Sequence, residues 1–361
     1  MPWQTSTIGE QEVHQVLELF FESFGHPMSA AQWHWKYLQK RADTLERPSF
    51  AVGVWDQNHN LVAHAGALIF TGWQPAQTVP RQTVYPHRIA EESGHPRQES
   101  GHTRLMIQIV DVMVKPEARG ARPGGLVYKV LMDRLRSCLA DCFPNALVYG
   151  FPGVRPFKLG EQLGFYQRQQ NYHLVPLSES VKRRSLLTGL LIEPADWRVG
   201  LNEVSAWWRD SVQYQDVAMI CRDQHYWEWR FMAHPHVSYQ LWRVKARVPW
   251  RRQAMAWFVT RSWSKNSHVL VDFVFRDGGR ELEEKQACLD ALAQMIGQGC
   301  SLYGWRVSAK TFPDTVVAMC FITSPQVKAS DARVSMGKAS FAEEPEPGNR
   351  LLFLPADTDV Y

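Results

Sequence analysis

The chain has 361 residues, a formal net charge of +4, 45% hydrophobic residues and 21% charged residues. This balance is typical of a globular protein and excludes a disordered chain. Because single hydrophobic cores stop growing at roughly 250 to 300 residues, the length predicts two domains. The charge is too small for the dense basic surface of a protein that binds duplex nucleic acid, so no nucleic-acid partner is expected.

Cysteine spacing and the length of apolar runs argue against a metal-binding protein and a membrane-spanning protein. The six cysteines show no metal-ligand spacing and are expected to be reduced core residues, so no metal is predicted. The longest apolar stretch, 186–192, is interrupted and far too short to cross a bilayer. Since the N-terminus also lacks a basic segment followed by an apolar run, we expect a soluble, cytoplasmic protein without a membrane span.

The first half of the chain alternates helical and strand-like patterns. Helices are predicted where apolar residues recur at helical spacing, and strands where short runs are apolar or β-branched. Ser29 is the expected N-cap of the second helix. The polar stretch 71–103 is expected to form a long loop or lid. The predicted elements are helices over 10–24 and 33–38, strands over 50–55, 61–70 and 106–114, a helix over 126–139, a strand over 146–149 and a helix over 157–163.

The second half repeats this order. The sequence Trp-His-Trp-Lys-Tyr at 33–37 is echoed by Trp-Glu-Trp-Arg-Phe at 227–231, with two tryptophans, a base and an aromatic residue in each. Four matches in the same order predict a duplicated α/β unit. The alternative is two unrelated mixed domains that share an aromatic bias. The other matches are two strand-like runs over 239–246 and 253–263, Val271-Asp272 against Val110-Asp111, and Tyr303-Gly304 against Tyr149-Gly150.

The repeat sets the predicted fold class and the domain boundaries. We expect an α/β fold of two tandem units, each with a central mixed sheet flanked by helices. The first unit is predicted over 1–176 and a linker over 177–200. The second unit is predicted over 201–335, and a linker-like tail over 336–361 could add a last strand.

A glycine-rich turn joins the buried strand 106–114 to the amphipathic helix that follows it. Successive backbone N–H groups at the positive end of a helix dipole favour a phosphate or pyrophosphate. Glycine lets the backbone approach an anion closely, and arginine adds charge-assisted hydrogen bonds. The alternative is a turn that only tightens the packing. The residues of the turn are Arg119, Gly120, Ala121, Arg122, Pro123, Gly124, Gly125 and Leu126.

The strand and turn together resemble a known motif. Residues 112–120, Val-Met-Val-Lys-Pro-Glu-Ala-Arg-Gly, followed by a Gly-Leu helix start, resemble the acyl-CoA-binding motif of the GNAT superfamily of acyltransferases. Leu-Gly-Phe-Tyr at 163–166 resembles its second motif, and the resemblance covers roughly 10–170. It implies that acetyl-CoA or another acyl-CoA is the co-substrate, with its pyrophosphate on the turn. It also implies that Met113 and Val114 supply the backbone N–H that polarises the thioester carbonyl.

Two positions depart from the family pattern. Arg122 replaces the first glycine of the turn. Gly160 stands where many members of the family have a tyrosine that protonates the leaving thiolate. Tyr149, Tyr166 or solvent could supply that proton instead, and the sequence does not choose among them.

Two residues are candidates for the base that takes a proton from an amine acceptor. Asp111 lies on the central strand, where a carboxylate beside an apolar run is suited to proton removal. Its alternative role is structural, because Asp272 recurs in the second copy. His64 lies on a strand that would border the acceptor groove, and its alternative role is that of a hydrogen-bonded core histidine.

The second unit has Asp277 and a shorter connection where the phosphate-binding turn should be. A carboxylate there would repel a pyrophosphate, so we expect this unit to complete the acceptor groove or to form the seam of a homodimer. The resemblance implies transfer of an acyl group from CoA to an amine of a small molecule or sugar. A hydroxyl acceptor, a longer acyl chain, and a non-catalytic CoA-binding or assembly protein that retains the fold are the alternatives.

Overall fold

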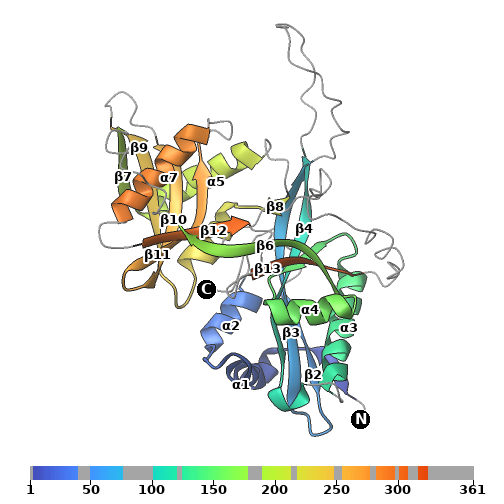
Figure 1. The fold of residues 1–361 in the computed structure, drawn as a ribbon. Helices are drawn as coiled ribbons and strands as arrows, with labels where there is room; N and C mark the ends of the chain where they lie inside the picture. Colours follow the sequence, from blue (N-terminus) through green and yellow to red (C-terminus); the bar gives the residue numbers. More distant parts are fainter. Residues whose placement is uncertain are drawn as a thin grey trace, which may run out of the picture.

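The computed structural model describes residues 3–39, 49–75, 101–119, 124–177, 189–212, 218–247, 254–276, 282–296, 301–307 and 316–323. Within these ranges the chain forms two units of mixed sheet and helices, joined through one continuous sheet (Figure 1). The predicted α/β fold with two tandem units is therefore confirmed. In the part of the chain that is described, no helix is both long and apolar enough to cross a membrane.

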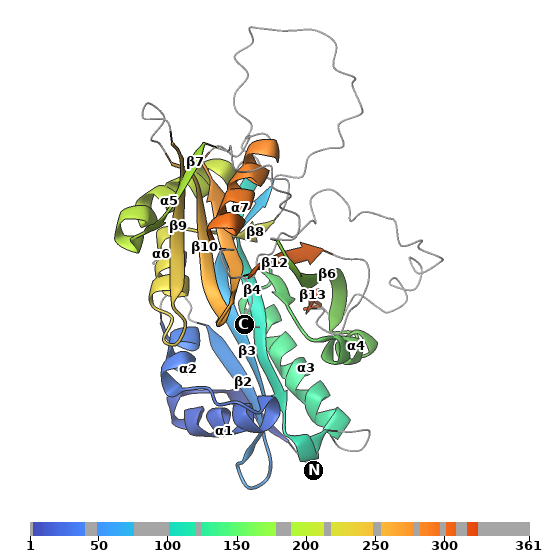
Figure 2. The same cartoon turned by 60° about the vertical axis from the view of Figure 1, so that its left-hand side comes forward.

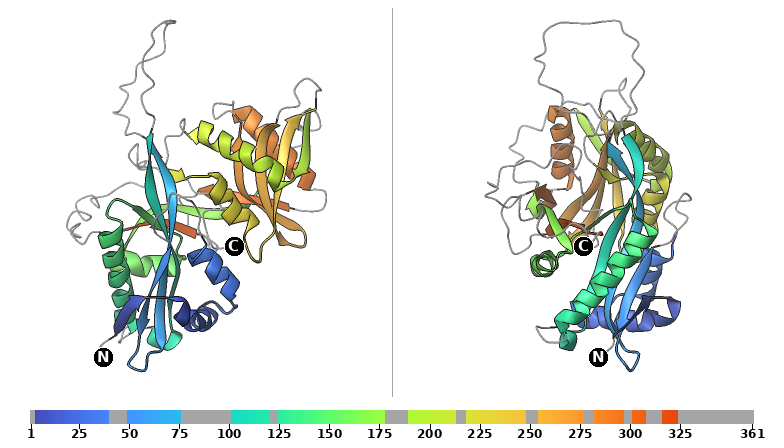
Figure 3. Two further views of the ribbon diagram at one scale, coloured as in Figure 1. Left: turned by 180° about the vertical axis from the view of Figure 1, so that it is seen from behind. Right: turned by 90° about the vertical axis from the view of Figure 1, so that its right-hand side faces the viewer.

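The first unit places a mixed sheet between two helical layers (Figures 2 and 3). Its elements are β1 (Gln4–Thr7), η1 (Glu10–Glu12), α1 (Val13–Phe24), α2 (Ala30–Tyr37), β2 (Phe50–Trp55), β3 (Leu61–Pro75), β4 (Gly101–Val114), η2 (Pro116–Ala118), α3 (Gly124–Cys142), β5 (Leu147–Gly150), α4 (Val154–Gln162) and β6 (Tyr166–Pro176). Strand β3 is buried on both faces: Leu68 and Phe70 pack in the core that contains α1 and α2, whereas Ala67 and Ile69 pack against α3 and α4. Alternation along the strand explains this division.

Local sequence signals fix the helix ends. The Ser29 hydroxyl accepts a hydrogen bond from the backbone N–H of Gln32 at 3.1 Å, which confirms the predicted N-cap of α2. Helix α1 ends at Gly25, whose φ of 76° is left-handed. Gly164 has a φ of 75° just beyond α4. Glycine adopts this conformation without the steric penalty of a Cβ atom, so both chain reversals depend on it.

The second unit repeats the order of the first. Strand β7 lies within the predicted linker 177–200 and pairs with β9 at the outer edge of the sheet. Pro194 lowers the strand signal there, but an edge strand tolerates proline because one side makes no ladder. The elements of this unit are β7 (Leu190–Ala195), α5 (Trp197–Val212), β8 (Met219–Ile220), α6 (Gln224–Trp227), η5 (Glu228–Met232), β9 (Tyr239–Ala246), β10 (Ala254–Ser264), β11 (Ser267–Phe275), α7 (Leu282–Ile296), β12 (Ser301–Val307) and β13 (Val316–Phe321).

The two units exchange their last strands. The sheet order is β1-β2-β3-β4-β5-β13-β6-β12-β11-β10-β9-β7, so β13 of the second unit lies between β5 and β6 of the first. In return, β6 pairs antiparallel with β12. Strand β8 also crosses over, because it pairs with β3 at Gly72 and Trp73. Each unit therefore completes the sheet of the other.

A reciprocal contact joins the repeated motifs of the two units. The indole N–H of Trp35 donates to the carbonyl of Trp229 at 2.8 Å, and that of Trp229 donates to the carbonyl of Trp35 at 2.9 Å. The two rings stack with centroids 4.5 Å apart and an interplanar angle of 6°. The contact is self-complementary in the manner of a twofold dimer interface, although both residues belong to one chain.

Two predicted segments fall partly or wholly outside the described residues. The expected loop 71–103 is shorter than predicted at both ends, since β3 continues to Pro75 and β4 begins at Gly101. Its interior, 76–100, and the tail from 324 onward lie outside the described residues.

We expect substitution of either stacked tryptophan to loosen the contact between the units. Trp35→Phe keeps a stacked ring but removes the buried indole donor, and should lower the free energy of unfolding by about 1 to 3 kcal/mol. The double variant Trp35→Phe/Trp229→Phe should lose less than the sum of the single losses, because the two residues share one contact. Urea denaturation measures both, with Trp263→Phe as an exposed control. Additive losses would contradict a shared contact.

Candidate functional site

The sheet opens between β4 and β5. The two strands pair in parallel from Met106 and Leu147 to Ile109 and Gly150, and the pairing stops there. Strand β4 continues to Val114, whereas the chain after Gly150 turns away into α4. This divergence leaves one side of β4 without a neighbouring strand over its last residues.

A β-bulge distorts β4 where the two strands diverge. The register with β3 pairs Gly66 with Val110 but His64 with Met113, so β4 carries one extra residue. Asp111 lies in this bulge with a φ of 49°, a left-handed conformation that aspartate tolerates better than most residues. The bulge redirects β4 at the mouth of the opening.

Three side chains hold the bulge from two neighbouring elements. The Lys36 ammonium lies 3.0 and 3.2 Å from the two carboxylate oxygens of Asp111, and the Tyr37 hydroxyl donates to one of them at 2.7 Å. The side chains of Lys36 and Asp111 are only 4% and 7% exposed. The backbone carbonyl of Asp111 is also engaged, because it lies 2.8 Å from His64 Nδ1.

His64 is a buried support for the bulge. Desolvation lowers its pKa below the usual 6.5, so the neutral ring is favoured and Nδ1–H donates to the Asp111 carbonyl. The side chain is fully buried and does not line the pocket described next. This placement matches the alternative role that the sequence left open, a hydrogen-bonded core histidine.

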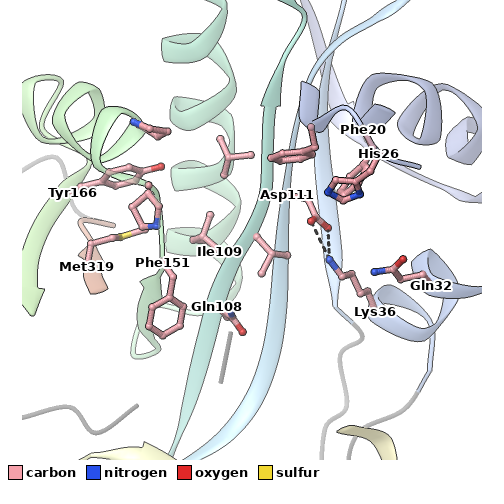
Figure 4. Close-up of a pocket in the computed structure, with 16 residues that line it drawn as sticks. Phe20, His26, Gln32, Lys36, Gln108, Ile109, Asp111, Phe151, Tyr166 and Met319 are labelled. Carbon is pink, nitrogen blue, oxygen red and sulfur yellow. Dashed lines mark hydrogen bonds and ion pairs between the residues drawn. The ribbon is translucent and has the colours of Figure 1, made fainter. Parts of the chain in front are cut away.

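A pocket of about 470 Å³ occupies the opening in the sheet. Figure 4 shows residues from both helical layers around it, with β4 between them. One wall comes from α1, α2 and the bulge; the other comes from the start of α4, from β6 and from the exchanged strand β13. The pocket therefore connects the two faces of the sheet. Its principal side chains are Phe20, Phe24, His26, Gln32, Lys36 and Asp111 on the first wall, and Phe151, Pro156, Tyr166 and Met319 on the second.

Tyr166 fills the space beside Gly160. A Cβ atom at Gly160 would lie 2.1 Å from Cδ2 of the Tyr166 ring, so a larger residue on α4 and this ring exclude one another. The Tyr128 hydroxyl on α3 donates to the Tyr166 hydroxyl at 3.0 Å. Burial raises the pKa of Tyr166 well above 10 and that of Tyr128 to about 12. Tyr166 is thus a protonated phenol on the wall of the pocket.

Tyr149 occupies a different position. It is fully buried in β5, its ring lies 5.8 Å from that of Phe151, and it does not line the pocket. Of the two tyrosines that the sequence offered as proton donors, the structure brings Tyr166 to the pocket.

The glycine-rich turn is described only at its two ends. Arg119 is exposed, and its Nε donates to the carbonyl of Val114 at 2.6 Å. Helix α3 begins at Gly124 and places Tyr128 beside Tyr166, so its first turns approach the wall of the pocket. Residues Gly120, Ala121, Arg122 and Pro123 lie outside the described residues, and of Gly125 and Leu126 the helical backbone alone is described.

The two predicted amide donors face opposite sides of β4. The Lys115 N–H donates to the carbonyl of Val62 on β3 at 2.8 Å. Because successive residues of a strand alternate sides, the amide of Met113 faces β3 and that of Val114 faces the open side. The Val114 carbonyl, bound by Arg119, points the same way.

The second unit contains a counterpart of the buried ion pair. Arg222 Nε lies 3.2 Å from Asp272 on β11, and the two side chains are 3% and 1% exposed. A register shift between β10 and β11 lies beside Asp272, as the bulge lies at Asp111. The predicted replacement turn around Asp277 lies outside the described residues.

Sequence inspection missed Lys36, although a signal was present. Lys36 lies between buried aromatic residues on α2, and the matching position of the second copy is the basic residue Arg230. A base that recurs on a buried helix face requires an acid nearby, since lysine is almost never fully buried without a partner. Asp111 was the candidate acid, because an aspartate recurs at the matching position, Asp272, of the second copy.

Comparison with known proteins supports the fold. No protein-family model and no curated protein sequence matches the chain. Among solved structures, a GCN5-related N-acetyltransferase from Anabaena variabilis matches with a TM-score of 0.58 and 10% identity, over 90% of this chain and 73% of that one. A GCN5-related N-acetyltransferase from Kribbella flavida matches with a TM-score of 0.52 and 14% identity, over 88% and 70%.

A tandem GNAT protein from the clavulanic acid biosynthesis pathway matches with a TM-score of 0.51 and 10% identity, over 90% of this chain and 99% of that one. At these identities the likeness shows the fold alone. The chain has the fold of the GNAT acyltransferases, built as two units in tandem, and the resemblance predicted from the sequence is confirmed at that level.

Breaking the buried ion pair should be costly. Lys36→Met leaves the Asp111 carboxylate buried without its ammonium partner, and should lower the free energy of unfolding by roughly 3 to 5 kcal/mol. Adding Asp111→Asn should recover part of this loss, because no uncompensated charge then remains. Lys129→Met, which breaks the exposed pair with Asp133, is the control and should cost less than about 1 kcal/mol. Equal losses for the two lysine variants would count against a buried pair.

Proposed function

We propose that the chain transfers an acetyl or other acyl group from CoA to an amine. The observation that carries the proposal is the pocket that passes through the sheet between the diverging strands. A donor on the α3 side and an acceptor on the α1 and α2 side can meet there from opposite faces. Holding two reactants in contact converts a bimolecular step into an effectively unimolecular one, which supplies several kcal/mol of the rate enhancement.

The donor side is assigned to the turn and the start of α3. The N-terminus of this 19-residue helix favours the pyrophosphate of CoA, and the exposed Arg119 adds a cation beside it. The amide of Val114, on the open side of β4, is the proposed donor to the thioester carbonyl oxygen. An amide held in a strand needs no reorganisation when negative charge develops on that oxygen.

The proposed reaction joins an alkylammonium ion and an acyl-CoA to give an amide, CoA and one proton. The amine loses a proton to solvent, its lone pair attacks the thioester carbonyl, and the C–N bond forms as the C–S bond breaks. The second amine proton is also lost to solvent, and the thiolate accepts one from the Tyr166 hydroxyl, which solvent reprotonates. Tyr166 is the proposed proton donor because it is a protonated phenol at the pocket wall.

Asp111 and His64 are proposed to act through the shape of β4. The carboxylate of Asp111 already accepts hydrogen bonds from Lys36 and Tyr37, and the Nδ1–H of His64 is used by a backbone carbonyl. Both residues stabilise the bulge that bounds the pocket. For Asp111 the second unit supports this role, because its counterpart Asp272 is also buried in an ion pair.

Donor binding is directly testable by thermal denaturation. Acetyl-CoA at 100 times its Kd should stabilise the protein by about 2.7 kcal/mol and raise Tm by several degrees. Arg119→Glu should abolish most of this shift, whereas Arg198→Glu, an equal charge change at an exposed position in the second unit, should leave it intact. Absence of a shift with every acyl-CoA tried would refute the proposed function. A shift without thioester consumption would instead favour the non-catalytic alternative.

Removal of the Tyr166 hydroxyl should slow the transfer step without weakening donor binding. Tyr166→Phe keeps the ring beside Gly160, so the Kd for acetyl-CoA should be preserved while kcat falls by about 100-fold. Tm should fall modestly, because the buried Tyr128 hydroxyl loses its acceptor. Since burial raises the pKa of Tyr166 well above 10, its hydroxyl stays protonated between pH 7 and 9. The ratio of the wild-type kcat to that of Tyr166→Phe should therefore stay constant across that range. Release of free CoA thiol measures the rate. An unchanged kcat in Tyr166→Phe would assign proton donation to solvent.

A further inference from the structure

The acceptor side of the pocket has an aromatic entrance. Phe20 and Phe24 of α1 lie with ring centroids 4.7 Å apart, and His26 lies 5.3 Å from Phe20 and 6.3 Å from Phe24. All three line the pocket, and Figure 4 labels Phe20 and His26. Phe24 is 47% exposed and Phe20 is buried, so the apolar surface in contact with solvent here comes mainly from Phe24. A bound apolar group would remove that surface from water, which is favourable in proportion to the area buried.

The charges of the pocket are internally compensated. Among the described residues that line it, the Lys and Asp side chains are Lys36 and Asp111, and they form a buried pair with each other. A second cationic or anionic group on the acceptor would therefore find no opposite charge in excess. The remaining polar side chains on this side are amides, Gln32 of α2 and Gln108 of β4. These two amides could form one or two hydrogen bonds with neutral polar groups of the acceptor.

The size of the pocket limits the acceptor. Its volume of about 470 Å³ falls within the range of about 300 to 1,000 Å³ typical of small-molecule sites. Because the acyl end of the donor must occupy part of the same space, the acceptor itself must be small.

We infer that the acceptor is a small primary amine on an aromatic or apolar body that carries no second charge. This inference rests on the proposed function and assigns the substrate class of the same site. The apolar body lies against Phe20 and Phe24, and the amine points past the bulge toward the thioester. A sugar amine fits this wall less well, because the described acceptor wall offers few partners for several hydroxyl groups.

Two exposed phenylalanines on one helix provide a matched pair of variants. Phe24 lines the pocket, whereas Phe21 is 55% exposed on the same helix and does not line it. Both can be truncated with little effect on the core. Phe24→Ala should raise KM for 2-phenylethylamine by about 10-fold and leave KM for acetyl-CoA unchanged. Phe21→Ala should change neither constant.

The experiment compares 2-phenylethylamine, glucosamine and putrescine as acceptors at saturating acetyl-CoA. Release of CoA thiol gives kcat/KM, and calorimetry in the presence of CoA gives amine binding without turnover. We expect 2-phenylethylamine to exceed both other amines by at least about 10-fold in kcat/KM or in affinity. Preference for glucosamine or putrescine, or equal behaviour of the two phenylalanine variants, would overturn the inference.

These outcomes separate the two proposals. Binding of 2-phenylethylamine that depends on Phe24, without turnover, supports the acceptor site and counts against the transfer step. Donor binding with transfer to glucosamine, insensitive to Phe24→Ala, supports the proposed function and overturns the acceptor class. Failure of the protein to bind any acyl-CoA while it binds no amine overturns both.

Discussion

The left-handed bulge at Asp111 is the constraint on which both the site and the seam between the units depend. A non-glycine residue with a φ of 49° persists only when its surroundings hold it. Here Lys36 and Tyr37 bind its carboxylate, and His64 binds its carbonyl. The two residues on α2 directly follow Trp35, which makes the reciprocal contact with the second unit. One short helix therefore fixes the bulge, part of the pocket wall and the seam together.

The exchange of strands makes the second unit part of the pocket. Strand β13 fills the position between β5 and β6, and its Met319 lines the pocket beside Tyr166. Without β13 the first sheet would expose two edges in its interior, and the pocket would lose part of one wall. The second unit thus contributes to the site through backbone pairing and one side chain.

Sequence patterns predicted the elements and their repeat because these depend on local periodicity. Apolar spacing gave α1, α3 and the buried strands close to their observed bounds, and the tryptophan motifs marked the two halves. The sequence did not predict which strands pair with one another, since a short apolar strand such as β13 contains no local signal that identifies its neighbours. The sequence also did not predict that Gly160 and Tyr166 are complementary. Gly160 lacks the family's tyrosine, but the ring of Tyr166, at the start of strand β6, occupies the space beside this position of helix α4.

The two copies separate what belongs to the fold from what belongs to function. Both units bury an acid beside a register shift and pair it with a base, Asp111 with Lys36 and Asp272 with Arg222, although these two bases occupy different positions of the repeat. In the second unit that pair is almost fully buried, and Asp272 also accepts a hydrogen bond from the Phe273 amide. A buried ion pair that recurs in both units is best explained by a role in stabilising the fold. The proposed chemistry must then lie in what the first unit adds, namely the cavity, the phenol of Tyr166 and the start of α3.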